Sequence, residues 1–590
     1  MMKNDNRDYN FHDNFKVNFS DEETKMDRGV KKPWLSSMGE IPFHIDLFKG
    51  TIYELVEDTA TRFPNLIAYE FMGREVSYKT LISEINNCAK ALKAIGIKPN
   101  EKVALCMPNL PQAVITFYAI NLVGAIAVMI HPLSAEKEIE SYIVESDSVA
   151  CLAIDMSYDK FKNIKLKKLV ITSAKDALGP FKKIAYNLTE GKGINKISND
   201  SNIILWKNFI ETGENYKGKY KVKRDMYEPA TLLFSGGTTG KSKAIVVSNY
   251  NINAIAAQMV TFNPILKPGD KLLAIMPLFH GYGLEGVHTM MTLGGQSILI
   301  PRFNPKKYAK LINKYKPNLL AGVPALYEGF FRMKDLQKAD LSFLKGIASG
   351  GDSITPSLKC KLDKFLEERG CRVKIREGYG LAESVASVCA APLFRHKEGS
   401  IGLPFPDMYF KICKLGTDDE VSYGEEGEIC LTGPTMMLGY YKNEEETKKV
   451  LHVHDDGYTW LHTGDLGSMD EDGFIYFKQR INRLIITNGY TVYPSQIENA
   501  LESHEKVFQS CVVGNADEAR GQKIKAYLVL VPGAKPTEEL KNEIMEHCKK
   551  NIAKYAWPKS IEFRDEFPKT LIGKVAYRHL EEEKIKECIC

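Results

Sequence analysis

Residues 234–243 combine glycines, hydroxyl side chains and lysines in a pattern that suits the binding of phosphate groups. Glycine permits tight turns and close approach of the backbone to a ligand, and a run of free backbone N–H groups forms a concavity that binds anions. Hydroxyl and ammonium groups add further hydrogen-bond donors. We therefore predict a phosphate-binding loop whose ligand-binding residues are Ser235, Gly236, Gly237, Thr238, Thr239, Gly240 and Lys243.

The same loop contains Gly240-Lys241-Ser242, which resembles part of the P-loop of NTPases and kinases. That motif requires a glycine five residues before Gly240, where this chain has Ser235, and a helix after the loop. Residues 244–247 are mostly β-branched and predict a strand instead. The loop is therefore expected to connect two strands. The alternatives are a P-loop enzyme, which would release ADP, and a simple hairpin that binds no ligand.

Other groups of glycines and polar residues follow at intervals along the chain. They lie at 276–280, 348–352, 377–383, 427–441, 462–465, 489–498 and 568–574. Together with the loop, these segments resemble the motifs of the adenylate-forming superfamily, which includes acyl-CoA synthetases, free-standing adenylation domains and luciferases. One segment alone would carry little weight, whereas seven in the order of the family make a chance match negligible. The overall length and the long stretch before the loop look like the long-chain fatty acyl-CoA synthetases.

The resemblance and the alternation of expected strands and helices both indicate an α/β protein. The resemblance implies a large N-terminal domain of the acyl-adenylate synthetase type, built from several subdomains, and a small mobile α+β C-terminal domain. We place an N-terminal arm at 1–45, the large domain at 46–480, a hinge at 481–483 and the small domain at 484–590. Within the large domain, residues 155–225 are expected to form a lysine-rich insertion.

The resemblance also implies which residues act in acyl-adenylate formation. Attack of a carboxylate on the α-phosphorus of ATP brings two anions together, so cations must neutralise the charge that develops. Lys574 is expected to bridge the acid carboxylate and the α-phosphate, and Glu383 is expected to hold Mg²⁺. The predicted catalytic residues are Lys574, Glu383, Thr238 and His280.

A further set of motif residues is expected to bind the nucleoside. Tyr379 should pack on adenine, and Asp465, whose carboxylate only accepts hydrogen bonds, should bind both ribose hydroxyls with Arg480 nearby. The predicted ATP- and AMP-binding residues outside the loop are Gly351, Asp352, Glu377, Gly378, Tyr379, Gly380, Asp465 and Arg480.

Transfer of the acyl group to a thiol, which the resemblance indicates is coenzyme A, requires Lys574 to leave the site. In the family the small domain turns about a hinge between the two reactions. The hinge residue corresponds here to Asn482, where relatives usually carry Asp or Lys. Gly489 and Tyr490 are then expected to line the thiol tunnel.

Besides Asn482, six positions depart from the family pattern: Gly236, Ser242, Ala244, Asn249, Ala382 and Ala556. Ala382 replaces a threonine that hydrogen-bonds near the α-phosphate, a loss of about 0.5–1.5 kcal/mol. Ala556 stands where relatives frequently have lysine, which argues against a contact from this position to a phosphate of coenzyme A. Because Glu383, Asp465 and Lys574 are all present, we expect an active enzyme.

The segment expected to line the acid pocket, 280–290, is apolar and partly small, and it contains no Lys, Arg or Asp. This composition favours a medium- or long-chain fatty acid over an amino acid, with an aryl acid as an alternative. A ligase that loads an acyl carrier protein is a second alternative. The carrier would be a separate chain, because no carrier domain is evident.

The bulk composition limits other classes of function. The 79 basic and 74 acidic residues give a net charge of +5, which is too even to predict nucleic-acid binding. The polar start lacks the apolar core of a signal peptide, so the 12 cysteines predict reduced thiols and a cytoplasmic protein. The lysines of 155–225 leave peripheral contact with the inner face of a membrane open, and a homodimer is also open. Residues 113–130 predict a buried helix, a turn and a core strand rather than a membrane span.

Overall fold

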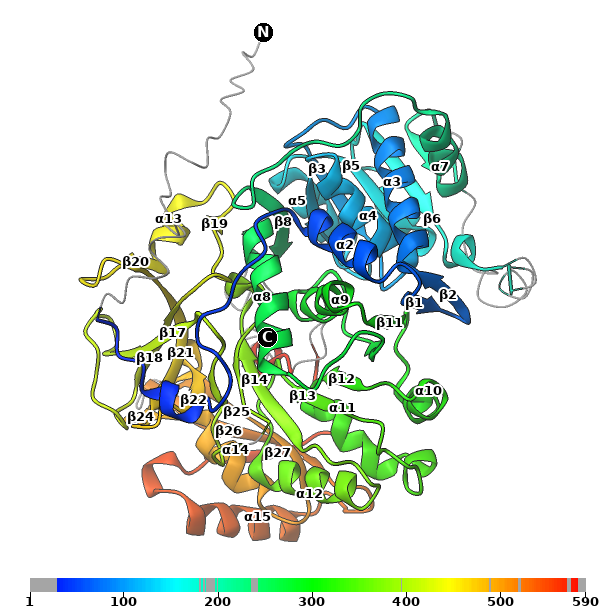
Figure 1. The fold of residues 1–590 in the computed structure, drawn as a ribbon. Helices are drawn as coiled ribbons and strands as arrows, with labels where there is room; N and C mark the ends of the chain where they lie inside the picture. Colours follow the sequence, from blue (N-terminus) through cyan, green and yellow to red (C-terminus); the bar gives the residue numbers. More distant parts are fainter. Residues whose placement is uncertain are drawn as a thin grey trace.

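The computed structural model describes residues 29–581 apart from 180–181, 184–185, 187–196, 199, 235–241, 394, 488–489, 518–520 and 570–574. Two large sheets, a smaller third sheet and a C-terminal α+β unit make up the fold (Figure 1). Strands and helices alternate through most of the large domain, so the predicted α/β class is confirmed.

The first large sheet contains nine of the described strands, in the order β16-β15-β14-β13-β12-β10-β11-β1-β2. The six strands from β14 to β1 are parallel to their neighbours, whereas β2, β15 and β16 pair antiparallel at the two edges. The strands are β1 Ile67–Phe71, β2 Arg74–Ser77, β10 Lys271–Ala274, β11 Gln296–Leu299, β12 Leu319–Gly322, β13 Gly346–Ser349, β14 Ile375–Gly380, β15 Ser387–Ala390 and β16 Leu403–Pro404.

The second large sheet contains eight described strands, in the order β19-β9-β8-β4-β3-β5-β6-β7. They are β3 Lys102–Cys106, β4 Ile126–Met129, β5 Ser148–Ile154, β6 Lys168–Thr172, β7 Ile203–Leu205, β8 Pro229–Phe234, β9 Ala244–Ser248 and β19 Gly439–Tyr440. β8 and β9 are antiparallel and pair up to Phe234 and Ala244, the residues that flank the predicted phosphate loop. The loop therefore connects two strands, as predicted, and no helix follows it directly.

Two helices that are buried on most of their surface, α8 and α9, pack against each other at the centre of the large domain (Figure 1). Their apolar side chains belong to one core that includes residues of both large sheets. The helices of the large domain are α2 Ile52–Arg62, α3 Tyr78–Ala94, α4 Pro111–Leu122, α5 Glu136–Glu145, α7 Trp206–Asn215, α8 Asn249–Phe262, α9 Gly281–Leu293, α10 Tyr308–Tyr315, α11 Pro324–Glu328, α12 Pro356–Glu367 and α13 Glu444–Lys448.

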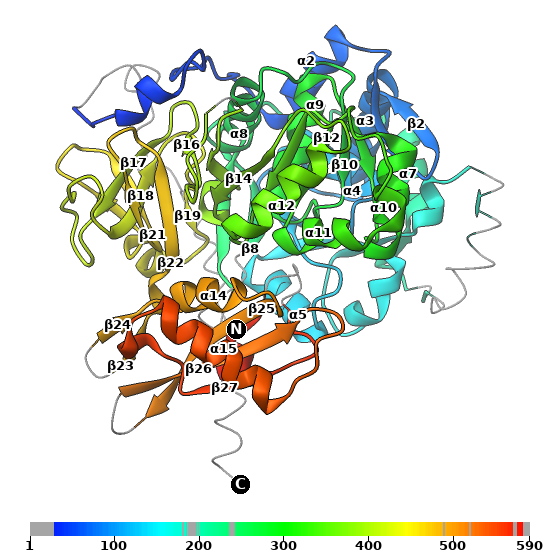
Figure 2. The same ribbon diagram turned by 90° about the horizontal axis from the view of Figure 1, so that it is seen from below.

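The third sheet completes the large domain and leads into the small one (Figure 2). Its strands are β17 Tyr409–Cys413, β18 Gly427–Thr432, β20 Leu451–Val453, β21 Thr459–Met469 and β22 Ile475–Arg480. The small domain contains β23 Ile485–Thr487, β24 Tyr490–Val492, α14 Pro494–Glu502, β25 Val507–Asp517, β26 Gly521–Leu530, α15 Glu538–Asn551 and β27 Ser560–Phe563. This order matches the α+β pattern expected for the segment, including a helix that begins at Pro494.

The segment at 113–130 folds as predicted. α4 is buried on all sides, Gly124 turns the chain with a φ of 77°, and β4 follows in the second sheet. None of the helices in the described ranges is long and apolar enough to cross a membrane. The described end of the N-terminal arm is also packed, because Trp34 is fully buried and Gly473 lies against its backbone.

The lysine-rich stretch differs from the expected surface insertion. Within 155–225, β6 and β7 extend the second sheet in parallel and α7 packs on α3. The lysine ammonium groups have local partners: Lys160 donates to two backbone carbonyls, Lys167 pairs with Glu101, and Lys168 donates to the carbonyl of Ser201. The apolar residues of β6 are buried on both faces of the sheet, whereas the lysines lie at the start of the strand or in the segments before it.

Candidate functional site

Asp465 lies where the first large sheet and the third sheet approach each other. It is on β21 and directly opposite Arg480 of β22, whose Nε is 3.0 Å from Asp465 Oδ1. Tyr379, at the end of β14, donates its hydroxyl proton to Asp465 Oδ2 at 2.6 Å. The structure thus brings together three predicted nucleoside-binding residues from three strands.

The electrostatics of this group favour a fixed negative charge on Asp465. Its side chain is 1% exposed, and the guanidinium of Arg480 lies against it. Burial, followed by the charge of Asp465, raises the pKa of Tyr379 well above its usual value, so the phenol remains a donor. A buried carboxylate that is held by one cation and one hydroxyl is a rigid acceptor for further donors.

Glu383 lies on a short 3₁₀ turn, Ala382–Ser384, directly after β14. Its Oε1 accepts a hydrogen bond from Tyr440 Oη at 2.9 Å. The ammonium of Lys243 lies 4.7 Å from the centroid of the Tyr440 ring and forms an ion pair with Glu446. Glu383 is therefore beside the end of the predicted phosphate loop, because Lys243 is the last loop residue.

The turn that carries Glu383 is held by close backbone contacts. Val385 adopts a φ of 67°, a conformation that costs a β-branched residue free energy and persists only where the surroundings impose it. A Cβ atom on Gly281 would lie 1.7 Å from the carbonyl oxygen of Val385, and one on Gly380 would lie 1.7 Å from that of Ala386. Glycine is required at both positions. The turn consequently rests against the first residue of α9, next to His280.

His280 is the N-cap of α9, and its Nδ1 accepts a hydrogen bond from the backbone N–H of Tyr282 at 3.3 Å. The neighbouring Tyr282 donates to the carbonyl of Ala348 at 3.3 Å, at the end of β13. The predicted adenine-side residues Gly351 and Asp352 follow this strand and are exposed. Tyr282 therefore contacts both His280 and the end of β13, the strand that precedes the predicted adenine-side turn.

Glu377 on β14 pairs with Ser349 on β13, which places the two halves of the predicted adenine site side by side. Burial raises the pKa of Glu377 to about 7, although Lys359 acts in the opposite direction. Gly378 and Gly380 share the strand with Glu377 and Tyr379. The predicted nucleoside residues are thus grouped at the ends of β13 and β14.

Several predicted residues lie outside the described part of the chain. These are the loop residues Ser235, Gly236, Gly237, Thr238, Thr239 and Gly240, the lysine Lys574, and Gly489 of the thiol tunnel. Tyr490 begins β24, but its side chain is also outside the description. The roles given to these residues remain predictions. Asn482 lies in the short turn Ile481–Arg483 between β22 and β23, at the expected junction of the two domains.

Two departures from the family pattern have structural explanations. Asn249 is buried, and its Oδ1 accepts hydrogen bonds from Ile52 N and Asn121 Nδ2 at 3.2 and 2.7 Å. Its amide also donates to the carbonyl of Glu228 at 3.2 Å, so it holds the start of α2 to the start of α8. Ala556 is 6% exposed in the core of the small domain, where a lysine would have to be buried.

The sequence analysis missed Glu285. This residue of α9 is 2% exposed, and its Oε2 accepts hydrogen bonds from the amide and the hydroxyl of Ser387 at 3.1 and 2.8 Å. Burial raises its pKa to about 7. The signal available in the sequence was a single glutamate in an apolar helix, which does not reveal what faces it.

Glu285→Gln should make stability less dependent on pH. A carboxyl group whose pKa is about 7 when folded and 4.5 when unfolded retains a proton that the unfolded chain has lost, so the free energy of unfolding falls as pH rises from about 4.5 to about 7. The difference amounts to on the order of 3 kcal/mol. The glutamine keeps an acceptor for Ser387, so the variant should melt above the parent at about pH 8 and close to it at about pH 4.5. The control is Glu75→Gln, which alters an exposed carboxylate. If the melting temperature changed with pH in the same way in both variants, the raised pKa of Glu285 would be contradicted.

Residues of β14, β21 and β22 thus form one buried polar group within an α/β fold. The chain matches the family model described as AMP-binding enzyme over residues 56–441, and the one described as AMP-binding enzyme C-terminal domain over residues 496–574. It therefore belongs to the family of AMP-binding enzymes, and the resemblance to adenylate-forming enzymes is confirmed.

Relatives of this chain are similar over nearly their whole length. A long-chain-fatty-acid–CoA ligase of Bacillus subtilis (strain 168) is 34% identical over 563 residues, which cover 94% of this chain and 98% of the relative. A long-chain-fatty-acid–CoA ligase of Yersinia pestis is 30% identical over 577 residues, with 94% and 99% covered. The solved structure of the anthranilate CoA ligase AuaEII in complex with anthranoyl-AMP shares the fold, with a TM-score of 0.79, 23% identity, and 93% and 99% of the two chains covered.

Proposed function

We propose that this chain is an ATP-dependent acid–thiol ligase. In the first reaction a carboxylate oxygen of the acid attacks the α-phosphorus of ATP, and pyrophosphate leaves as acyl-AMP forms. In the second, the thiolate of coenzyme A attacks the acyl carbon, and AMP leaves with the bonding electron pair. The observation that carries the proposal is Asp465, a buried carboxylate held by Arg480 and Tyr379 within an AMP-binding fold.

The geometry supports a role for Asp465 in binding ribose. A carboxylate only accepts hydrogen bonds, and Tyr379 and Arg480 hold the Asp465 carboxylate in place. Its two oxygens suit the two neighbouring hydroxyl groups that a ribose provides. Tyr379 would then lie against the base, because its hydroxyl is directed at the same carboxylate.

Mg²⁺ fits beside Glu383. This ion is usually held by one or two carboxylates together with phosphate oxygens, and Glu383 is a partly exposed carboxylate near the loop that is expected to bind phosphate. The hydrogen bond from Tyr440 Oη orients its Oε1. When bound, the ion would neutralise the charge that develops on the phosphates during adenylation. Coenzyme A and ATP are the proposed substrates that accompany it.

A medium- or long-chain fatty acid is the proposed acid substrate. The two relatives named above, both called long-chain-fatty-acid–CoA ligases, align with almost the whole chain. The expected pocket wall on α9 is apolar, with Leu284 and Met290 buried on it.

Pyrophosphate release tests the proposal directly. The purified chain would be given ATP, Mg²⁺ and one acid at a time from a panel of fatty, aryl and amino acids, with coenzyme A, with a holo acyl carrier protein, or with neither. We expect pyrophosphate and AMP to depend on a fatty acid, and the thioester to appear on coenzyme A. Preferential loading of the carrier, or turnover with aryl acids alone, would replace the proposed acceptor or acid. ADP as the product would rule out adenylation.

A further inference from the structure

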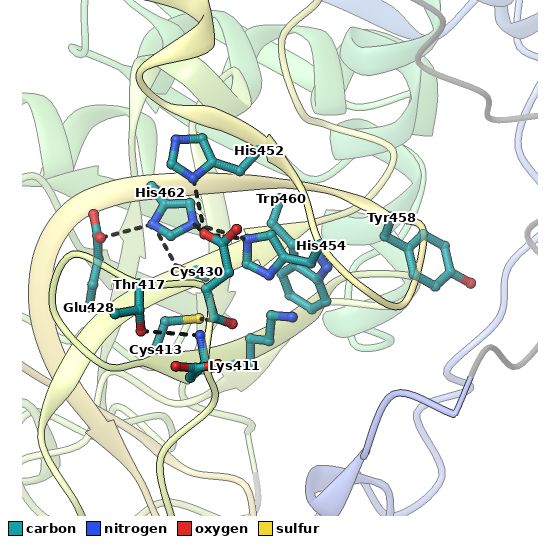
Figure 3. Close-up of polar contacts among 12 residues, drawn as sticks. Lys411, Cys413, Thr417, Glu428, Cys430, His452, His454, Tyr458, Trp460 and His462 are labelled. Atoms are coloured by element: carbon teal, nitrogen blue, oxygen red, sulfur yellow. Dashed lines mark hydrogen bonds and ion pairs between the residues drawn. The ribbon is translucent and has the colours of Figure 1, made fainter.

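Three histidines and an aspartate converge in the third sheet, where His462 begins the motif segment 462–465. His452 is on β20, His454 follows that strand, His462 is on β21, and Asp418 lies in the loop between β17 and β18. Figure 3 shows the rings of His452, His454 and His462 turned toward one another. We call these four residues the three-histidine cluster.

The nitrogen and oxygen atoms of the cluster have the spacing of metal ligands. His452 Nδ1, His454 Nε2 and His462 Nε2 lie 3.1, 3.5 and 3.3 Å from Asp418 Oδ1, and the two Nε2 atoms are 3.0 Å apart. All four atoms are within 4.8 Å of one another. A tetrahedral Zn²⁺ ion with bonds of about 2.0–2.1 Å requires its ligand atoms to be about 3.3 Å apart. Four of the six separations are 3.0–3.5 Å, close to this value, and the other two are within 4.8 Å.

His462 contacts the cluster with one ring nitrogen and Glu428 with the other. Its Nδ1 lies 2.9 Å from Glu428 Oε2. Its Nε2 faces both Asp418 Oδ1, at 3.3 Å, and His454 Nε2, at 3.0 Å. The ring is therefore oriented with Nε2 directed into the cluster, as in a metal-bound histidine whose other nitrogen contacts a carboxylate.

A metal ion suits the ligand chemistry that the cluster presents. Neutral imidazole and carboxylate are common zinc ligands. Glu428 provides the outer carboxylate that usually orients a metal-bound histidine, and its other oxygen accepts the backbone N–H of Gly464 at 2.8 Å. His454, 2% exposed, stacks on the indole of Trp460. The imidazoles of His462 and His454 are therefore held in place before any ion binds.

The cluster is also accessible. Asp418 and His452 are 48% and 35% exposed, and they line a pocket of about 370 Å³ together with Glu428 and His462. An ion can reach the buried imidazoles of His454 and His462 from this pocket. Four protein ligands would complete a tetrahedral shell and leave no position for a substrate, which is typical of a structural rather than a catalytic site.

We propose that Asp418, His452, His454 and His462 bind one divalent transition-metal ion, with Zn²⁺ preferred. The ion joins the β17–β18 loop to β20 and β21. Because His462 precedes Asp465 by three residues on β21, the ion holds the strand that carries the buried carboxylate. The site stands on these contacts alone and does not depend on the reaction that the chain catalyses.

Metal titration of the full-length chain tests the site. After dialysis against a chelator, Zn²⁺ would be added and the bound metal counted by mass spectrometry, and Co²⁺ would be added in parallel for its visible absorption. We expect one equivalent of zinc, the intense spectrum of tetrahedral Co²⁺, and a higher melting temperature with metal than without. No retention of zinc at micromolar concentrations, or an octahedral cobalt spectrum, would overturn the proposal.

Variants locate the ion. His452→Gln and Asp418→Asn alter the exposed ligands, so they should fold, and each should weaken zinc binding by more than about 100-fold; Glu428→Gln, which alters an orienting group, should weaken it by about 10–100-fold. The matched controls alter potential metal ligands outside the cluster. They are His547→Gln in the small domain and the double change Cys588→Ser with Cys590→Ser, and both should bind zinc as the parent does.

Cys430 offers the sharpest comparison, because its Sγ lies 3.5 Å from His462 Nδ1 and a second ligand set of Glu428, Cys430 and His462 is conceivable. The proposal predicts that Cys430→Ser binds zinc as the parent does. Loss of zinc in Cys430→Ser with retention in Asp418→Asn would move the ion to the second set and refute the assignment. Unchanged binding in both His452→Gln and Asp418→Asn would refute it as well.

Discussion

Asp465→Asn should lower kcat/KM for ATP by about 10²–10⁴-fold. Hydrogen bonds to a charged group contribute about 1.5–3 kcal/mol each, and the proposed role gives Asp465 two of them, to the ribose hydroxyls. The substitution also leaves Arg480, whose Nε is 3.0 Å from Asp465 Oδ1, without its counter-charge beside the nucleotide. Steady-state pyrophosphate release at varied ATP concentration measures the effect, which should include a raised KM for ATP.

Tyr379→Phe is the matched control for this prediction. It removes the 2.6 Å hydrogen bond to Asp465 Oδ2 but leaves the carboxylate charge and the aromatic ring in place. We expect a loss of about tenfold, in line with one hydrogen bond to a charged group. Melting curves of both variants check that the fold is retained. A smaller loss for Asp465→Asn than for Tyr379→Phe would show that the carboxylate does not bind the ribose.

Lys574→Ala should suppress acyl-adenylate formation by about 10²–10³-fold, the size of effect seen when one group that stabilises developing charge is removed. The ammonium is expected to lie between the acid carboxylate and the α-phosphate only during the first reaction. The second reaction needs this position cleared, so transfer from preformed acyl-AMP to coenzyme A should change by less than about threefold. The two half-reactions are measured separately, as pyrophosphate release and as thioester formed from synthetic acyl-AMP.

Lys569→Ala removes a nearby exposed lysine of the small domain and provides the control. It should leave both half-reactions within about twofold of the parent, since an isolated surface charge interacts weakly through water. If Lys574→Ala slowed both half-reactions equally, the lysine would have no special role in adenylation. The expectation that the small domain turns about the hinge between the two reactions would then lose its support.

The strand after the predicted phosphate loop could be predicted from the sequence, because clustered β-branched residues favour a strand. Residues 244–247 form β9 as expected. The motif residues also keep a local arrangement: Glu383 lies on the turn after the strand that carries Tyr379, and the hairpin register of β21 and β22 sets Asp465 opposite Arg480. Their roles in binding and catalysis remain predictions.

Other features depended on how distant segments pack. The lysine-rich stretch was expected to be a solvated insertion, yet Val170 of β6 is fully buried, because pairing with β5 supplies the partner that its own sequence does not reveal. The environment of Glu285 could not be predicted either, because its partner Ser387 lies 102 positions away in the sequence. The contacts that set its pKa are not encoded in any single segment.

The amino-acid sequence by itself determined the class of protein, the order of its motifs and the chemistry that each motif can perform, because these follow from residue types and spacings within single strands and turns. Only the tertiary structure decided which of these residues meet. It placed Tyr379 on Asp465 and Tyr440 on Glu383, and it gathered Asp418 with three histidines into one cluster. The physical reason is that such contacts join atoms from separate strands, so their distances depend on the packing of whole sheets rather than on any local pattern.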